Sequence, residues 1–149
     1  MIFLTFKQAV GFNQKQIEIL GGSFGMRDSS LLESALEMPK QGFGDEYLHD
    51  FPFEMAAAYL YHISKNHPFL DGNKRTALHV CLTFLKVNGY QCTLQSPELE
   101  DFTVEVATGV HSKAAIAKKL EENCTKLPWC LKRIKNLLNF FKKTKVELI

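Results

Sequence analysis

The chain has 149 residues, of which 46% are hydrophobic and 23% charged, and its formal net charge is +2. This composition is typical of a soluble globular domain and argues against a disordered chain. The four cysteines include no C-x-x-C pair, so we expect free thiols in a reducing cytosol and neither a disulfide framework nor a zinc site. Because no signal peptide is evident and no apolar run could span a bilayer, we expect a cytoplasmic protein.

The charge is distributed unevenly along the chain. Residues 1–125 hold eleven Lys and Arg against fifteen Asp and Glu, a net of −4, whereas residues 126–149 hold seven against one, a net of +6. The basic character therefore belongs to the C-terminal tail. We predict one globular domain over residues 1–125 and a basic amphipathic extension over residues 126–149.

Capping and stop signals divide the chain into segments with helical hydrophobic spacing. Most segments begin at a Thr, Ser or Pro that suits a helix start, and residues 30–33 form a capping-box pattern. In chain order the predicted helices run from Thr5 to about Leu20, from Ser30 to Pro39, from Pro52 through Ile63, from Ala77 to Asn88, from Ser96 to Gly109 and from Ser112 to about Cys124.

Strand signals are few. Only residues near 90–94 and part of residues 40–50 are strand-like, and no useful stretch alternates with period two. We find no internal repeat and no low-complexity segment. The predicted fold is therefore a single all-α domain with at most a short β-hairpin, followed by a basic C-terminal helix.

Residues 67–77, with the sequence HPFLDGNKRTA, carry most of the functional information. They place a histidine, a carboxylate, a glycine, an amide and two cations directly before a helical apolar pattern. A helix N-terminus has unpaired backbone N–H groups and a partial positive charge, which make it an anion site. The pattern predicts a site for the magnesium-bound polyphosphate of a nucleotide.

Two residues of this run, His67 and Asp71, suit the reacting centre. His67 can accept the proton of an attacking hydroxyl near neutral pH. Asp71 offers hard oxygen ligands to Mg²⁺, which usually binds one or two carboxylates together with substrate phosphates. Taken singly, His67 could instead cap the preceding helix, and Asp71 could cap the next one.

The four residues that follow Asp71 form a candidate phosphate cradle. Gly72 lets the backbone approach a phosphate, and Asn73 can hold the loop or reach a phosphate oxygen. Lys74 and Arg75 add positive charge, and Arg75 suits a two-pronged phosphate grip. Either cation alone would be interpreted as part of a solvated face, but the combination with a base, a carboxylate and a glycine favours the functional interpretation.

The run resembles the signature of the Fic superfamily, specifically its death-on-curing (Doc) branch of toxin–antitoxin toxins. Residues 21–28 with 31–36, and residues 84–90, are also similar to that branch, so the resemblance covers about residues 3–122. It implies a Fic/Doc helical fold with the motif loop between two central helices. It also implies that His67 is the general base, Asp71 the magnesium ligand and residues 72–75 the phosphate cradle.

Two positions depart from the broader Fic pattern and match the Doc branch. Lys74 replaces its second glycine, and Leu78 replaces its second arginine. A lysine crowds the cradle, and the lost arginine removes a partner of the terminal phosphates in the adenylylating pose, so the triphosphate should sit differently.

The Doc resemblance implies transfer of the terminal phosphate of ATP to a Ser, Thr or Tyr hydroxyl of a target protein. The family's best-known substrate is translation elongation factor Tu. Transfer of AMP (adenylylation) by the same base and cradle is the close alternative. An alternative of another class is a non-catalytic binding protein that acts through its partner and its basic tail.

Residues 42–49 lie where the family carries a flap that docks the target peptide. Gly42, Phe43 and Gly44 are therefore candidate docking residues, and an ordinary surface loop is the alternative. Fic-type enzymes are also often restrained by a helix with the motif S/T-x-x-x-E-G/N. Residues 96–101 come close to this motif but end in aspartate, so we expect restraint in trans by a cognate antitoxin. We expect no direct role of the protein in nucleic-acid binding.

A second metal-dependent chemistry can be weighed from the histidines. His49, Asp50 and His62, together with the motif's own histidine and aspartate, could indicate an HD phosphohydrolase. Such an enzyme needs several metal ligands on separate helices, and it would leave the glycine–asparagine–cation run unexplained. The nucleotide site is therefore the favoured interpretation.

The basic tail has an amphipathic pattern. Leu131, Ile134, Leu138 and Phe141 share one helical stripe, and the basic residues lie largely elsewhere. We expect this stripe to pack on its own domain or on a second copy. Contact with a membrane surface or an acidic partner is the less favoured alternative.

Overall fold

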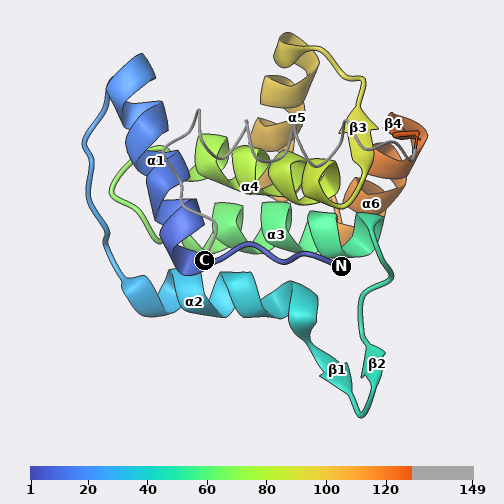
Figure 1. Cartoon of the computed structure of the whole chain (residues 1–149). Coiled ribbons are helices and arrows are strands. Elements are labelled where there is room, and N and C mark those ends of the chain that lie inside the picture. Colours follow the sequence, from blue (N-terminus) through green and yellow to red (C-terminus); the bar gives the residue numbers. More distant parts are fainter. Residues whose placement is uncertain (129–149) are drawn as a thin grey trace.

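The computed structural model describes residues 1–128 and confirms a mostly helical fold with two small antiparallel strand pairs (Figure 1). In chain order the elements are α1 (Phe6–Leu20), α2 (Ser29–Glu37), the 3₁₀ helix η1 (Met38–Lys40), β1 (Gly42–Phe43), β2 (Glu46–Tyr47), α3 (Phe53–Asn66), α4 (Asn73–Val87), β3 (Tyr90–Cys92), α5 (Ser96–Thr108), α6 (Lys113–Glu122) and β4 (Cys124–Lys126). The amphipathic stripe predicted for the tail lies outside the described residues. Within residues 1–128 no helix is both long and apolar enough to cross a membrane.

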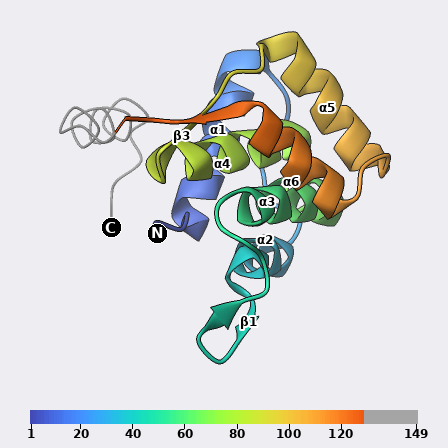
Figure 2. The ribbon, with the colours of Figure 1, turned by 90° about the vertical axis from the view of Figure 1, so that its right-hand side faces the viewer.

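The helix α3 is central because it is buried on all sides. Every residue from Met55 to Leu60 is buried, including three successive alanines that allow neighbouring helices to approach closely. The helices α2, α4, α5 and α6 all pack against α3, and α1 packs against α4. Figure 2 shows α5 and α6 along one side of the central pair of α3 and α4.

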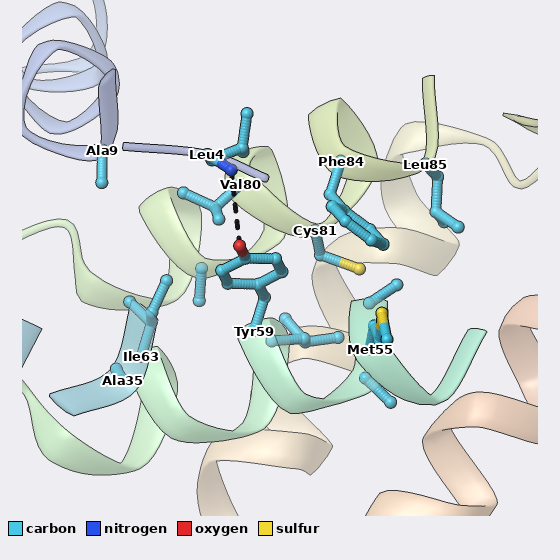
Figure 3. Close-up of a cluster of buried hydrophobic side chains, with 14 of the residues drawn as sticks. Leu4, Ala9, Ala35, Met55, Tyr59, Ile63, Val80, Cys81, Phe84 and Leu85 are labelled. Carbon is cyan, nitrogen blue, oxygen red and sulfur yellow. Dashed lines mark hydrogen bonds between the residues drawn. The ribbon is translucent and has the colours of Figure 1, made fainter. Parts of the chain in front are cut away.

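The core between α3 and α4 is filled by side chains from both helices (Figure 3), among them Met55, Tyr59, Ile63, Val80, Cys81 and Phe84. Burying each large apolar side chain contributes roughly 1.5–3 kcal/mol. The hydroxyl of Tyr59 accepts a hydrogen bond from the backbone N–H of Leu4 (3.4 Å), which ties the N-terminal segment to this core. The packing fixes the C-terminal end of α3 against the N-terminal end of α4, where the motif loop lies.

Some helix starts follow the predicted caps and others do not, since α4 begins at Asn73 and not at Ala77. Thr5 and Gln8 form a capping box at the start of α1, and Ser112 caps α6. The capping box predicted at Ser30 is wrong, because Asp28 is the cap of α2 and its carboxylate accepts the backbone N–H of Ser30 at 2.8 Å. The cap therefore lies two residues earlier than the pattern indicates, and the helix begins at Ser29.

The strands form two separate pairs. The hairpin of β1 and β2 falls within residues 40–50, and β3 falls within residues 90–94, as predicted. The partner of β3 is β4, which the sequence does not predict: the last helix ends at Glu122, and Tyr90 then pairs with Lys126. The domain boundary predicted after residue 125 thus falls inside a paired strand.

Candidate active site

The loop that joins α3 to α4 carries the motif. Two residues with left-handed backbone bound it: His67, with φ 48°, ends α3, and Gly72, with φ 76°, begins α4. This conformation costs a residue with a side chain roughly 1–2 kcal/mol, so the surrounding loop must hold His67 in place. The reversal brings the exposed His67 side chain and the N-terminus of α4 to one cavity.

Asn73 closes the motif loop with both ends of its side-chain amide. Its Oδ1 accepts the backbone N–H of Phe69, and its Nδ2 donates to the carbonyl of the same residue, both at 2.9 Å. Phe69 is 2% exposed and anchors the loop in the core. Of the two roles that the sequence leaves open for Asn73, its side chain performs loop closure here.

A second loop, residues 21–28, holds the motif loop from outside. The backbone N–H groups of Arg27 and Asp28 donate to the carbonyl of Pro68 at 2.8 and 3.2 Å. In the opposite direction, the N–H of Leu70 donates to the carbonyl of Gly25 at 2.9 Å. The two loops therefore form a hydrogen-bonded unit, in which one segment orients the other.

Asn13 of α1 supports the motif loop from the buried side. It is 0% exposed, and its Nδ2 donates to the carbonyl of Asp71 at 2.9 Å and to Oγ1 of Thr76 at 3.1 Å. A Cβ at position 72 would lie 2.9 Å from the same Nδ2, so Asn13 leaves room only for Gly72. The positive φ of Gly72 also favours glycine at this position.

Asp71 presents its carboxylate at the cavity wall. One oxygen, Oδ1, accepts the backbone N–H of Gly72 and lies 3.6 Å from Nη2 of Arg75. The other, Oδ2, accepts no hydrogen bond within residues 1–128, and a side chain at Gly22 would collide with it. One carboxylate oxygen is thus used to orient the group, and the other is available to a ligand.

The cavity has a volume of about 760 Å³ and is bordered by the motif loop, α1, α4 and α5. Ligand sites commonly measure about 300–1,000 Å³. The six residues that the sequence assigns to catalysis, metal binding and phosphate binding all line it: His67, Asp71, Gly72, Asn73, Lys74 and Arg75. Leucines and a valine from α1, α4 and α5 give the rest of its wall an apolar character.

The first turn of α4 supplies the donors of an anion site. The first bond within the helix runs from the N–H of Thr76 to the carbonyl of Gly72 at 2.8 Å. The N–H groups of the three preceding residues, Asn73 to Arg75, have no earlier helical carbonyl to reach. They carry the positive end of the helix dipole, beside the partly exposed guanidinium of Arg75.

Comparison with known proteins agrees with this geometry. Residues 3–85 match the model of the Fic/DOC family. The protein kinase Doc of Escherichia phage P1 is 37% identical over 114 residues, which cover 76% of this chain and 89% of that protein. The chain belongs to the Fic/Doc family. The toxin Doc of Mycolicibacterium smegmatis is 35% identical over 102 residues, which cover 67% of this chain and 78% of that protein.

A Fic/Doc site implies a magnesium ion, and the donors present fit one. The cavity wall carries a carboxylate with one uncommitted oxygen, on Asp71, whose side chain is 47% exposed. Magnesium is commonly held by one or two carboxylates and completed by water and substrate phosphates. Within residues 1–128 no three His, Cys, Asp or Glu side chains converge as a protein-only metal site. Asp71 therefore suits an ion that it shares with a nucleotide.

The histidines considered for an HD phosphohydrolase lie elsewhere. His49 and His62 are not among the cavity residues. Burial, together with the nearby Lys113 and His49, lowers the pKa of His62 to about 4. These two histidines are therefore neutral groups of the interior, and the geometry does not bring them to His67 and Asp71.

The candidate flap is a real hairpin, but it lies apart from the cavity. Phe43, at its tip, is 95% exposed, and neither Gly42 nor Gly44 lines the cavity. The hairpin precedes α3 and the motif loop follows it, so they lie at opposite ends of a 14-residue helix (Figure 1). Its role in docking a target stays a prediction.

Several cavity residues are not evident from the sequence motif. Gln16 of α1 contacts His79 of α4 (Nε2 to Nδ1, 3.1 Å), and both line the cavity. Glu100 of α5 lines it too, although the ion-pair partner of Arg75 is Asp71 and not Glu100. Asn13, which supports the motif loop without lining the cavity, could have been found as a polar residue among the mostly apolar buried residues of α1. Gln16, His79 and Glu100 have no such signal in the sequence.

Proposed function

We propose that this Fic/Doc protein is a toxin that transfers the terminal phosphate of ATP to a hydroxyl group of a target protein, in the presence of Mg²⁺. The observation that carries the proposal is the composition of one cavity. It joins a proton acceptor, His67, to a carboxylate, Asp71, and to the N-terminus of α4. This combination meets the needs of phosphoryl transfer, which depends on positioning and on stabilisation of negative charge.

Each group has a definite task in this reaction. The imidazole of His67 takes the proton of the target hydroxyl as its oxygen attacks the γ-phosphorus. The bond from the γ-phosphorus to the bridging oxygen breaks, and ADP leaves. The N–H groups of the first turn of α4, together with Arg75, stabilise the phosphate charge. A bound Mg²⁺, held by Asp71, supplies further neutralisation of the phosphate oxygens.

The choice of phosphate over AMP is supported by the cavity wall. Leu78, at the position where the broader Fic pattern has its second arginine, lines the cavity with an apolar side chain. The wall therefore lacks a cation there to hold terminal phosphates as a leaving group. Lys74 lines the cavity beside it and replaces the second glycine of that pattern. The relative from phage P1 is itself named a protein kinase.

Two partners belong to the proposal. The target offers a Ser, Thr or Tyr hydroxyl, and translation elongation factor Tu is the candidate implied by the resemblance. The second partner is a cognate antitoxin, because one relative is named a toxin, and residues 96–101 do not supply a complete restraining motif.

The test combines growth with the mass of the target. Expression of the full chain should arrest bacterial growth, and expression of the His67→Ala variant should not. Elongation factor Tu incubated with the full chain, ATP and Mg²⁺ should gain the mass of one phosphate. A gain of AMP would assign the protein to the adenylylating enzymes. An unmodified target, in cells whose growth is arrested equally by both proteins, would favour the non-catalytic alternative.

A further inference from the structure

Three of the four cysteines lie in the C-terminal half of α4 and in the strand pair that follows it, and none of the three lines the cavity. Cys81 belongs to α4 and is fully buried, whereas Cys92 on β3 and Cys124 on β4 are half-buried. Cys92 and Cys124 are direct partners in the register of the strand pair. All three are free thiols in this structure. The fourth, Cys130, lies outside the described residues.

The hydrogen-bond pattern of the two strands defines the geometry of this thiol pair. On one side, the N–H of Thr93 donates to the carbonyl of Asn123 at 2.9 Å. Further along the pair, the N–H of Leu127 donates to the carbonyl of Gly89 at 2.8 Å. In antiparallel strands, hydrogen-bonded and non-hydrogen-bonded partners alternate. Cys92 and Cys124 therefore form a non-hydrogen-bonded pair.

That type of pair suits a disulfide. Opposite Cα atoms in non-hydrogen-bonded positions are about 4.5 Å apart, with their side chains closer than in the other type. Disulfides span Cα separations of about 4.4–6.8 Å, so both strands can keep their places when the bond forms. The same argument does not extend to Cys81, which occupies a helix in the core.

The two sulfur atoms also differ in reactivity. A hydrogen bond from the Cys124 thiol, together with the backbone N–H groups of Leu94 and Thr93, lowers the pKa of Cys92 to about 6. The same shared proton raises the pKa of Cys124. Burial raises the pKa of Cys81. Because the thiolate is the reactive form, Cys92 is the thiol suited to react first, and Cys124 is suited to react second.

We infer that Cys92 and Cys124 form a peroxide-sensitive pair that is converted reversibly to a disulfide joining β3 to β4. In the first step, the Cys92 thiolate attacks an oxygen of hydrogen peroxide. The O–O bond breaks, hydroxide leaves, and Cys92 becomes a sulfenic acid. In the second step, the Cys124 sulfur displaces hydroxide from the Cys92 sulfur, forming the S–S bond. In total, two thiols lose two electrons and two protons, and one peroxide becomes two waters.

The disulfide closes a ring that contains α5 and α6. Glu100, Thr103 and Val104 of α5 belong to the cavity wall, so the bond restrains a segment that borders the proposed active site. The cradle itself lies at the other end of the 15-residue helix α4, about 22 Å away along its axis. Oxidation should therefore stabilise the domain and leave the cradle intact.

The experiment uses the full reduced chain, treated with hydrogen peroxide and then with an alkylating reagent. Peptide mapping should recover a Cys92–Cys124 cross-link, the intact mass should fall by about 2 Da, and dithiothreitol should reverse both changes. The thermal midpoint of the oxidised form should rise by roughly 5–15 °C. The Cys92→Ser and Cys124→Ser variants should lose the cross-link, whereas Cys130→Ser, a matched control outside the pair, should retain it.

Peptide mapping of the oxidised wild-type chain tests the Cys92–Cys124 bond even if a cysteine variant fails to fold. A bond from either cysteine to Cys130 would contradict the inference, and so would oxidation of Cys92 to the sulfinic acid without a cross-link. A second readout is the alkylation rate of Cys92 against pH. Its midpoint should lie near pH 6 and move upwards in Cys124→Ser; an unchanged midpoint would contradict the assignment of Cys124 as the hydrogen-bond donor.

Discussion

Asn13 of α1 donates its side-chain amide to the backbone carbonyl of Asp71 at 2.9 Å, across 58 positions of sequence. The same amide nitrogen donates to Thr76, in the first turn of α4. One buried side chain therefore holds both the proposed magnesium ligand and the helix whose N-terminus forms the proposed phosphate site. The position of the motif loop depends on a helix outside the motif.

Replacement of Asn13 by Ala should destabilise the protein and weaken nucleotide binding together. Two buried acceptors would lose their donor, at a cost of about 1–3 kcal/mol. Urea unfolding and calorimetric titration with magnesium and ATP measure the two effects. Gln14→Ala, at the exposed neighbouring position, is the control and should change neither. Destabilisation with unchanged ATP affinity would show that Asn13 does not position the cradle.

Replacement of Gly72 by Ala should reduce affinity for ATP more than replacement of Gly21 does. Both glycines have nearly the same positive φ, 76° and 77°, but ψ is 11° at Gly72 and 172° at Gly21, so alanine strains the backbone more at Gly21 and the comparison is one of ATP affinity and not of stability. Only at Gly72 does the new Cβ meet Asn13, at 2.9 Å, because nothing lies within 4 Å of the position at Gly21. Equal affinities in the two variants would contradict a cradle that depends on the close approach to Asn13.

The stability of the protein should fall between about pH 6.5 and pH 4 through His62. Burial lowers the folded-state pKa of His62 from 6.5 to about 4, so the unfolded chain binds the extra proton in this window. Stability is then lost as the pH falls below 6.5. The His62→Gln variant should show a flatter dependence of stability on pH in urea unfolding. A wild-type slope retained in His62→Gln would assign the effect to another group.

Deletion of residues 129–149 should leave phosphate transfer intact and change solubility or self-association. The truncation is placed after residue 128 because Lys126 pairs with Tyr90 in the strand pair of β3 and β4. A helix with Leu131, Ile134, Leu138 and Phe141 on one face would need to bury that face. Sizing of both forms, and flotation with anionic vesicles, distinguish self-association from membrane contact. Loss of turnover with ATP binding retained would place the tail in the active site.

The sequence predicts those parts of the fold and site that depend on local signals. Thr5 and Ser112 cap their helices, and His67 with residues 70–75 reaches one cavity because these residues are close in sequence across a helix start. At α2 two polar residues compete as caps, and the capping-box pattern does not reveal that Asp28 prevails over Ser30. Local patterns therefore place an element more reliably than they place its first residue.

The remaining features depend on contacts between distant segments. The strand β4 has three residues, too few for a period-two pattern, and it exists because it pairs with β3. Asn13 reaches the motif loop, and Glu100 the cavity, only after α1 and α5 pack against α4. The pairing of Cys92 with Cys124 likewise follows from strand register, which no spacing of cysteines in the chain indicates.

The most direct measurement incubates elongation factor Tu with ATP that is labelled on either the γ-phosphate or the α-phosphate. The full chain and the His67→Ala variant are compared. With label on the γ-phosphate, the wild-type chain should label elongation factor Tu, and with label on the α-phosphate it should not. The His67→Ala variant should bind magnesium and ATP normally but transfer label about 10²–10⁴-fold more slowly, because it lacks the proton acceptor. His111→Ala, whose imidazole pairs with Glu105, should behave as the wild type. Transfer of the α-label, or an undiminished rate in His67→Ala, would contradict the proposed phosphate transfer.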